Sequence, residues 1–149
     1  MVAADIRLQT APFDYGAEST RIAAEASGAG AVVTFLGLVR DDQGRLTAME
    51  IEHYPGMTER ALAAIAQEVG QRWALARVTI IHRHGRLLPG EAIMMVGTAA
   101  RHRAAAFAAA DFLMDYLKSR APFWKKEFHA TGADWVAARD EDEAALRRW

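Results

Sequence analysis

Short apolar runs alternate with segments of helical periodicity along the chain, and this alternation restricts the fold more than any other feature. Three runs rich in β-branched or bulky residues, 31–39, 78–82 and 92–97, are typical of buried strands. Between and after them, residues 58–73 and 102–119 repeat apolar residues at helical spacing, as helices that bury one face do. The order predicts an α+β fold with helices packed on a mixed or antiparallel sheet.

Weaker patterns complete the predicted order of elements. A length of 149 residues matches one ordinary domain, so we expect a single domain over 1–149. We expect its helices to cover one face of the sheet. The remaining predicted elements are strands over 6–10, 46–54, 123–128 and 134–137 and helices over 13–26 and 140–149.

Local signals suggest how some of these elements begin, end and pair. Turn residues 41–44 separate two predicted strands, which we therefore expect to form an antiparallel pair. Thr58 is the expected N-cap of the helix that follows Gly56. Residues 85–90, which include Pro89, are predicted as a turn region, and Pro122 is expected to end the long helix.

The composition excludes several classes of protein. Eighteen basic and nineteen acidic residues give a net charge of -1, which argues against non-specific nucleic-acid binding. No apolar run approaches the roughly 18 residues of a membrane span, and the first residues lack the pattern of a secretory signal, so we expect a cytoplasmic protein. The absence of cysteine excludes disulfides, zinc ribbons and a cysteine nucleophile. Any sulfur chemistry would need sulfur that another molecule brings.

The three lysines of the chain stand close together at 118, 125 and 126, whereas every other basic residue is arginine. A buried lysine can lose its proton and act as a base or nucleophile, which arginine cannot do. Between Arg101 and Lys126, six basic residues stand against only Asp111 and Asp115. The pattern predicts an anion-binding site that contains lysine, with an ordinary solvated basic edge as the alternative.

The cations of this segment lie at opposite ends of the predicted long helix. His102 and Arg103 stand at its start, where free N–H groups favour an anion. Lys118 lies about 24 Å away at 1.5 Å per residue. Either the two ends serve separate sites, or a second subunit helps to build one site. Arg40 is a further candidate because it follows an apolar strand and opens a turn.

Other chemistry-bearing residues are interpreted as structural. His82 and His84 would share a strand face, but no third ligand near them completes a metal site. Glu50 and Glu52 are expected on a solvated strand face. Motifs for dinucleotide binding, nucleotide hydrolysis and serine hydrolysis do not occur, and we expect neither a metal nor a cofactor.

Four segments together resemble the large, catalytic subunit of molybdopterin synthase. The resemblance extends from about residue 10 to Trp149. Its longest motif, Met-Asp-Tyr-Leu-Lys-x-Arg-Ala-Pro-Phe-Trp-Lys-Lys-Glu, contains all three lysines. The four segments are residues 30–40, 52–59, 82–85 and 114–127.

The resemblance implies an α+β fold of the molybdopterin synthase large-subunit type and a sulfurtransferase activity in molybdenum cofactor biosynthesis. The substrate would be cyclic pyranopterin monophosphate, which gains the dithiolene of molybdopterin. A small ubiquitin-like subunit would carry the sulfur as a thiocarboxylate on its C-terminal glycine. Two large subunits would form a homodimer with one small subunit at each end, a heterotetramer. Such a carrier would account for the missing cysteine.

The same resemblance implies roles for individual residues. Lys118 would lie beside the incoming thiocarboxylate, and Lys125 would line the same pocket, so that both are candidate catalytic residues. Side chains that would bind the substrate are Arg40, His102, Arg103 and, from the other large subunit, Arg139. We expect core packing rather than pocket lining for Phe35, Met114 and Pro122.

Two alternative functions remain open from the sequence. A non-catalytic module that binds a pterin phosphate or another anion would use the same basic cluster. A hydrolase that opens the cyclic phosphate alone would need a metal or an activated nucleophile, and the sequence offers neither.

Overall fold

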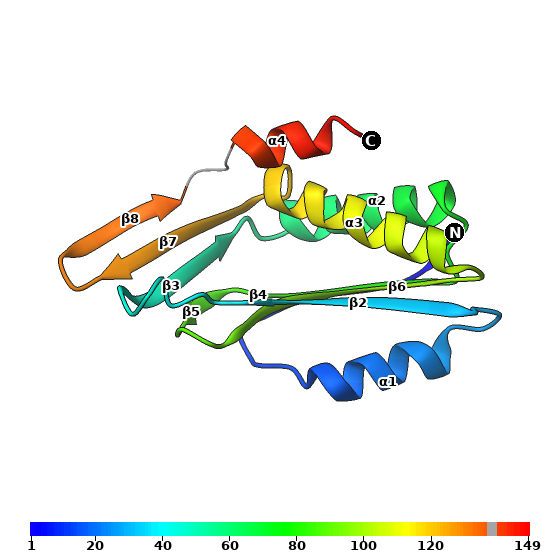
Figure 1. Ribbon diagram of the computed structural model, residues 1–149, viewed down its shortest axis with the longest axis horizontal. Coiled ribbons are helices and arrows are strands. Elements are labelled where there is room, and N and C mark those ends of the chain that lie inside the picture. The colour runs from blue at the N-terminus through cyan, green and yellow to red at the C-terminus, as the bar shows by residue number, and fades with distance from the viewer. Residues whose placement is uncertain (137–139) are drawn as a thin grey trace.

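The computed structural model describes residues 1–136 and 140–149 and contains two four-stranded sheets (Figure 1). In spatial order, the first sheet consists of β1 (Ala3–Gln9), β4 (Arg77–Arg83), β6 (Ala92–Ala100) and β2 (Ala31–Leu38). The second consists of β5 (Gly85–Leu87), β3 (Leu46–His53), β7 (Phe123–His129) and β8 (Gly132–Val136). Only β1 and β4 pair in parallel among the described strands. The predicted α+β class is confirmed.

Helices cover both faces of the first sheet. α1 (Tyr15–Glu25) lies on one face, while α2 (Met57–Arg72) and α3 (Arg103–Ser119) lie on the other (Figure 1). The expectation that all helices share one face is therefore wrong. Because β4 and β6 are buried at nearly every position, both of their faces need an apolar cover. α4 (Asp140–Leu146) packs on α3, and no helix in the described residues is both long and apolar enough to cross a membrane.

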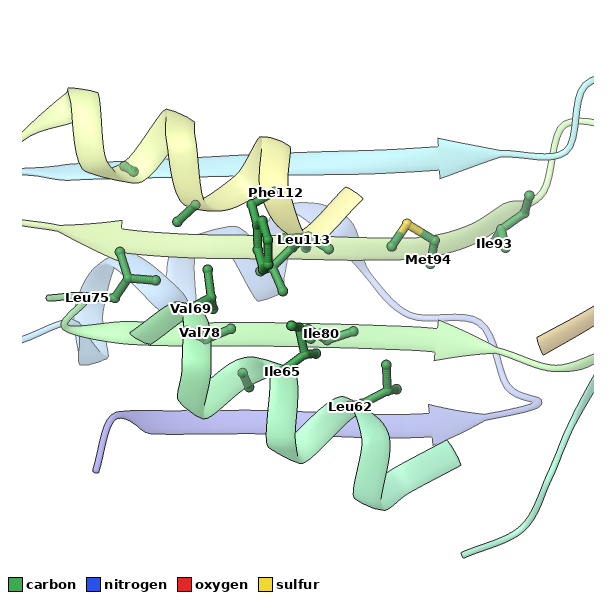
Figure 2. Close-up of a cluster of buried hydrophobic side chains, with 14 of the residues drawn as sticks. Leu62, Ile65, Val69, Leu75, Val78, Ile80, Ile93, Met94, Phe112 and Leu113 are labelled. Carbon is green, nitrogen blue, oxygen red and sulfur yellow. The ribbon is translucent and has the colours of Figure 1, made fainter. Parts of the chain in front are cut away.

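The larger buried cluster fills the space between the first sheet and helices α2 and α3. Figure 2 shows Leu62, Ile65 and Val69 of α2 beside Val78 and Ile80 of β4. A smaller cluster under α1 includes Ile22, Ile81 and Met95. Side chains alternate along a strand, so the next residue of β4 on the α2 and α3 face after Ile80 is His82.

The expected pairing of β2 with β3 is wrong. β2 pairs with β6, whereas β3 pairs with β5 and β7 in the second sheet. Instead of turning back after β2, the chain exchanges backbone hydrogen bonds with the loop before β6: the Val39 N–H donates to Glu91 and the Gly90 N–H donates to Val39. The residues that follow then lead into the other sheet. The turn region also contains the short strand β5, which the sequence pattern missed.

Thr58 is not the N-cap of α2. That position belongs to Gly56, whose φ of 85° suits glycine, and the Glu59 carboxylate accepts a hydrogen bond from the Gly56 N–H. The Thr58 hydroxyl instead accepts from the Tyr54 N–H at 2.9 Å and donates to the Pro122 carbonyl at 3.0 Å. Thr58 thereby ties the start of α2 to the residue that precedes β7.

Candidate active site

A cavity of about 390 Å³ opens where the first sheet meets the second sheet and the last turns of α3. Phe35, Met114 and other apolar side chains of β2, β6 and α3 form its walls. Met114 also packs against the larger core cluster, as expected, whereas the expectation of core packing is wrong for Phe35, which is exposed. The polar side chains in its lining are Arg40, His82, Lys118 and Lys125. The cavity is therefore mainly apolar, with cations at its edge.

A row of residues across the first sheet forms the floor of this cavity. Gly37 of β2 pairs with Met94 of β6, which in turn pairs with His82 of β4. A Cβ on Gly37 would lie 3.3 Å from the Met94 sulfur. A larger residue at this position would therefore press on the Met94 side chain in the floor of the cavity.

The two cavity lysines come from different elements that meet at this point. Lys118 lies in the last turn of α3 and is exposed. After the chain turns at Pro122, Lys125 of β7 points into the cavity. Phe123, two residues before it on the same strand face, lines an adjoining hollow instead. Lys126 points to the opposite face, where its ammonium lies over the rings of Phe128 and Trp135.

Electrostatics distinguishes Lys125 from an ordinary surface lysine. Burial lowers the pKa of its ammonium below the usual 10.5, and the charge of Lys118 lowers the pKa further. Asp142 and Glu127 oppose this shift. A lysine with a lowered pKa gives up and regains a proton closer to neutral pH, which suits general acid–base chemistry.

A second hollow, of about 520 Å³, adjoins the cavity and shares Arg40 and both lysines with it. Three carboxylates line this hollow but not the first cavity: Asp42, Glu127 and Asp142. Asp142 belongs to α4. Sequence reasoning missed these carboxylates. Glu127 could have been predicted, because it follows Lys125 by two residues on the same strand and therefore shares its face.

The structure separates the remaining predicted residues from the cavity. His102 is the N-cap of α3 and Arg103 its first residue, both exposed and at the opposite end of that helix from Lys118. Arg139 lies outside the described residues. Arg40, Lys118 and Lys125 are thus brought together, and His102 and Arg103 are not.

The two histidines of β4 and its end occupy different surroundings. His82 is buried, and its ring stacks on Phe123 at a centroid distance of 3.8 Å. His84 lies instead against His53, at 4.2 Å between ring centroids. Within residues 1–136 and 140–149, no three histidine, aspartate or glutamate side chains gather closely enough to hold a metal.

The chemistry of such a site follows from its charges. Two ammonium groups and a guanidinium converge on an apolar cavity. The buried ammonium of Lys125 binds an anion there more strongly than it would in water, because its surroundings screen it less. The same cations stabilise negative charge that develops on oxygen during acyl or phosphoryl chemistry. The arrangement suits a reaction with anionic intermediates.

Comparisons with known proteins agree with one another. The family model of the MoaE protein matches residues 8–120. The chain is 69% identical over 144 residues to a molybdopterin synthase catalytic subunit from Cereibacter sphaeroides, covering 97% of this chain and 99% of that protein. It is 51% identical over 140 residues to the Escherichia coli protein of the same name, covering 93% of each chain.

Solved structures give the same result. A molybdopterin biosynthesis MoaE protein from Burkholderia ambifaria has a TM-score of 0.84 and 54% identity, over 98% of this chain and 97% of that one. Molybdopterin synthase from Staphylococcus aureus has a TM-score of 0.78 and 27% identity, over 88% and 96%. The resemblance inferred from the motifs is confirmed: this chain belongs to the MoaE family of molybdopterin synthase catalytic subunits.

Proposed function

We propose that this chain is a sulfurtransferase, the catalytic subunit of molybdopterin synthase, and that it inserts sulfur into cyclic pyranopterin monophosphate. The observation that carries this proposal is the convergence of Lys118 and Lys125 with Arg40 on one cavity. The sulfur donor would be the C-terminal thiocarboxylate of a small ubiquitin-like carrier subunit. The reaction would take place in the cytoplasm.

The two lysines would serve the transfer in different ways. As sulfur bonds to the substrate, the carrier's carbonyl carbon exchanges its sulfur for an oxygen of water and passes through an oxyanion. The exposed ammonium of Lys118 would bind the incoming thiocarboxylate and stabilise this oxyanion. Lys125, whose pKa is lowered by burial, would protonate the oxygen that leaves the substrate. Arg40 would hold the phosphate with its planar guanidinium.

We further propose that a second copy of this chain completes the site. His102 and Arg103 lie at the far end of α3, so a small ligand in the cavity cannot reach them on the same chain. One turn further along α3 from Arg103, Phe107 is 62% exposed, which leaves an apolar side chain beside the basic end for another subunit to cover. In the assembled homodimer, the partner subunit would bring its own His102 and Arg103 to this cavity. Arg139 would likewise reach into the site from the partner subunit.

Single-turnover formation of the dithiolene tests the proposed reaction. The wild-type chain, a thiocarboxylated carrier and the substrate should give product, and a carrier with an ordinary carboxylate should give none. Lys118→Ala should reduce the rate by about 100-fold or more, since a charge-stabilising group is lost. Lys126→Ala is the matched control, because its ammonium faces away from the cavity. Carrier binding without product from the wild type would leave an anion-binding module.

Mixing two inactive variants tests the composite site. Lys118→Ala and Arg103→Ala chains should each be inactive as homodimers. If each site combines residues of two chains, random re-association restores one intact site per mixed dimer, or about a quarter of the wild-type activity. No recovery, despite mixed dimers seen by mass spectrometry, would contradict the shared site.

A further inference from the structure

His82 is a polar side chain at the floor of the cavity that the proposed reaction does not use. It is 4% exposed, and its Nδ1 lies 2.8 Å from the backbone carbonyl of Arg83. A carbonyl oxygen only accepts hydrogen bonds, so Nδ1 carries the proton of the neutral ring. This bond fixes the orientation of the imidazole.

The carbonyl that holds His82 is itself part of a rigid element. The Arg83 guanidinium is buried and donates to the backbone carbonyls of Thr10 and Ala92, at 3.0 to 3.1 Å. It also lies 3.5 Å from a carboxylate oxygen of Glu91. Three segments of the chain are therefore tied together directly behind the His82 ring.

The His82 ring is also a contact between the two sheets. His82 belongs to β4 of the first sheet, and Phe123 is the first residue of β7 in the second. The rings are nearly parallel, with 14° between their planes. No ladder of backbone hydrogen bonds joins the two sheets among the described residues, so side-chain contacts of this kind help to set their relative position, together with the chain that runs from β4 directly into β5.

The start of β7 is held from two sides. The Thr58 hydroxyl binds the Pro122 carbonyl, and the His82 ring packs on the next residue, Phe123. Lys125 follows two residues later on the same strand face. A shift at Phe123 would therefore be passed on to the Lys125 ammonium over a single strand repeat.

We propose that His82 is a positioning residue for Lys125: its ring, fixed by the Arg83 carbonyl and stacked on Phe123, holds β7 so that the Lys125 ammonium stays in the cavity. The kinetic part of this inference rests on the proposed function, whereas the placement of Lys125 is measurable without turnover. Burial also lowers the pKa of His82 to about 3, so the ring is neutral near pH 7 and adds no charge beside Lys125.

The three lysines make a direct measurement feasible. Lysine labelled at Cε and Nζ gives only three signals, which Lys118→Arg, Lys125→Arg and Lys126→Arg assign. In the wild-type chain, the Lys125 signal should titrate below the ordinary value. Burial and the charge of Lys118 lower the Lys125 pKa, and the carboxylates of Asp142 and Glu127 oppose this shift.

His82→Ala removes the stack and should let water reach Lys125, which moves the Lys125 pKa back toward its ordinary value. Single-turnover rates should fall about 10- to 100-fold, with little change in carrier affinity, because a misplaced catalytic group affects the chemical step. His82→Phe keeps an aromatic ring on Phe123, so the Lys125 pKa should stay lowered and most of the single-turnover rate should be retained. His84→Ala, whose ring lies outside the cavity, is the control.

Phe123→Leu tests the same contact from the other sheet and serves if His82→Ala fails to fold. It should shift the Lys125 titration in the same direction. An unchanged Lys125 titration in folded His82→Ala or Phe123→Leu protein would overturn the inference. If the wild type makes no product but the Lys125 titration still depends on His82, the positioning inference stands and the proposed function fails.

Discussion

Thr58→Val, which replaces a hydroxyl by a methyl group, is expected to lower the free energy of unfolding more than most substitutions of this size. Thr58 is completely buried, and its hydroxyl makes two hydrogen bonds, one from the Tyr54 N–H and one to the Pro122 carbonyl. Valine has nearly the same shape, so no cavity forms. The substitution removes only the two bonds and leaves both backbone groups without this partner at a partly buried site.

The expected magnitude follows from these two groups. Each lost bond leaves one backbone group without its partner, which costs about 1–2 kcal/mol where that group is only partly buried. We therefore expect the free energy of unfolding to fall by about 2–4 kcal/mol. For a chain of this size, each kcal/mol lowers Tm by about 2–4 °C, so the loss is about 5–15 °C.

Urea unfolding followed by circular dichroism measures this loss, and an unchanged slope with denaturant shows that the unfolded state is the same. Thr47→Val is a matched control, because the Thr47 hydroxyl also donates to a carbonyl of β7, that of Phe128, at 2.9 Å, but in an exposed position. It should cost about 0.5 kcal/mol or less. Equal losses for the two variants would refute the argument that burial makes the Thr58 bonds valuable.

Three further outcomes follow from the charged groups around the cavity. The unfolded chain binds a proton at His82 near pH 6.5, whereas the folded chain binds it only near pH 3, so this residue makes the fold less stable as the pH falls from 6.5 to 3. In urea unfolding at a series of pH values, His82→Phe should weaken the dependence of the unfolding free energy on pH over this range, and an unchanged dependence would contradict the assignment. Lys125 loses its charge at a lower pH than an ordinary lysine, so the alkaline limb of the plot of transfer rate against pH should fall below pH 10.5. Lys125→Arg, if active, should move this alkaline limb to higher pH, and an identical limb in both proteins would exclude Lys125 as its source. Arg40→Ala should raise KM for the cyclic phosphate substrate about 10-fold or more, and an unchanged KM would remove Arg40 from the phosphate site.

The helices and most strands could be predicted from the sequence because their signals are local. The apolar spacing over 102–119 and the run 78–82 each record which face is buried, whatever lies opposite. Pairing of strands is not local. Turn residues 41–44 are compatible with a hairpin, but the contact of Val39 with the loop before β6 decides the path of the chain.

Thr58 failed as a prediction for a related reason. Its position fits an N-cap by sequence, yet its hydroxyl is used by Pro122, 64 residues away. No pattern within one turn of helix records such a partner. The capping role then falls to Gly56 and Glu59, which the local sequence also allows.

The site was predictable where its residues are close in sequence. The grouping of lysines pointed to Lys118 and Lys125, and strand alternation separates Lys125 from Lys126. The role of His82 in the floor of the cavity was not predictable, because it depends on how the second sheet meets the first. Its alternation with Val78 and Ile80 indicated only a buried face.

The two adjoining hollows differ in their net charge, and this difference gives the site a direction. The apolar cavity has cations but no carboxylates in its lining, whereas the neighbouring hollow adds Asp42, Glu127 and Asp142. A flexible chain with a negative tip would be attracted more strongly when its tip lies in the cavity than when it lies in the neighbouring hollow, where carboxylates offset the same cations. An uneven electrostatic potential of this kind orients an approaching chain before any specific contact forms.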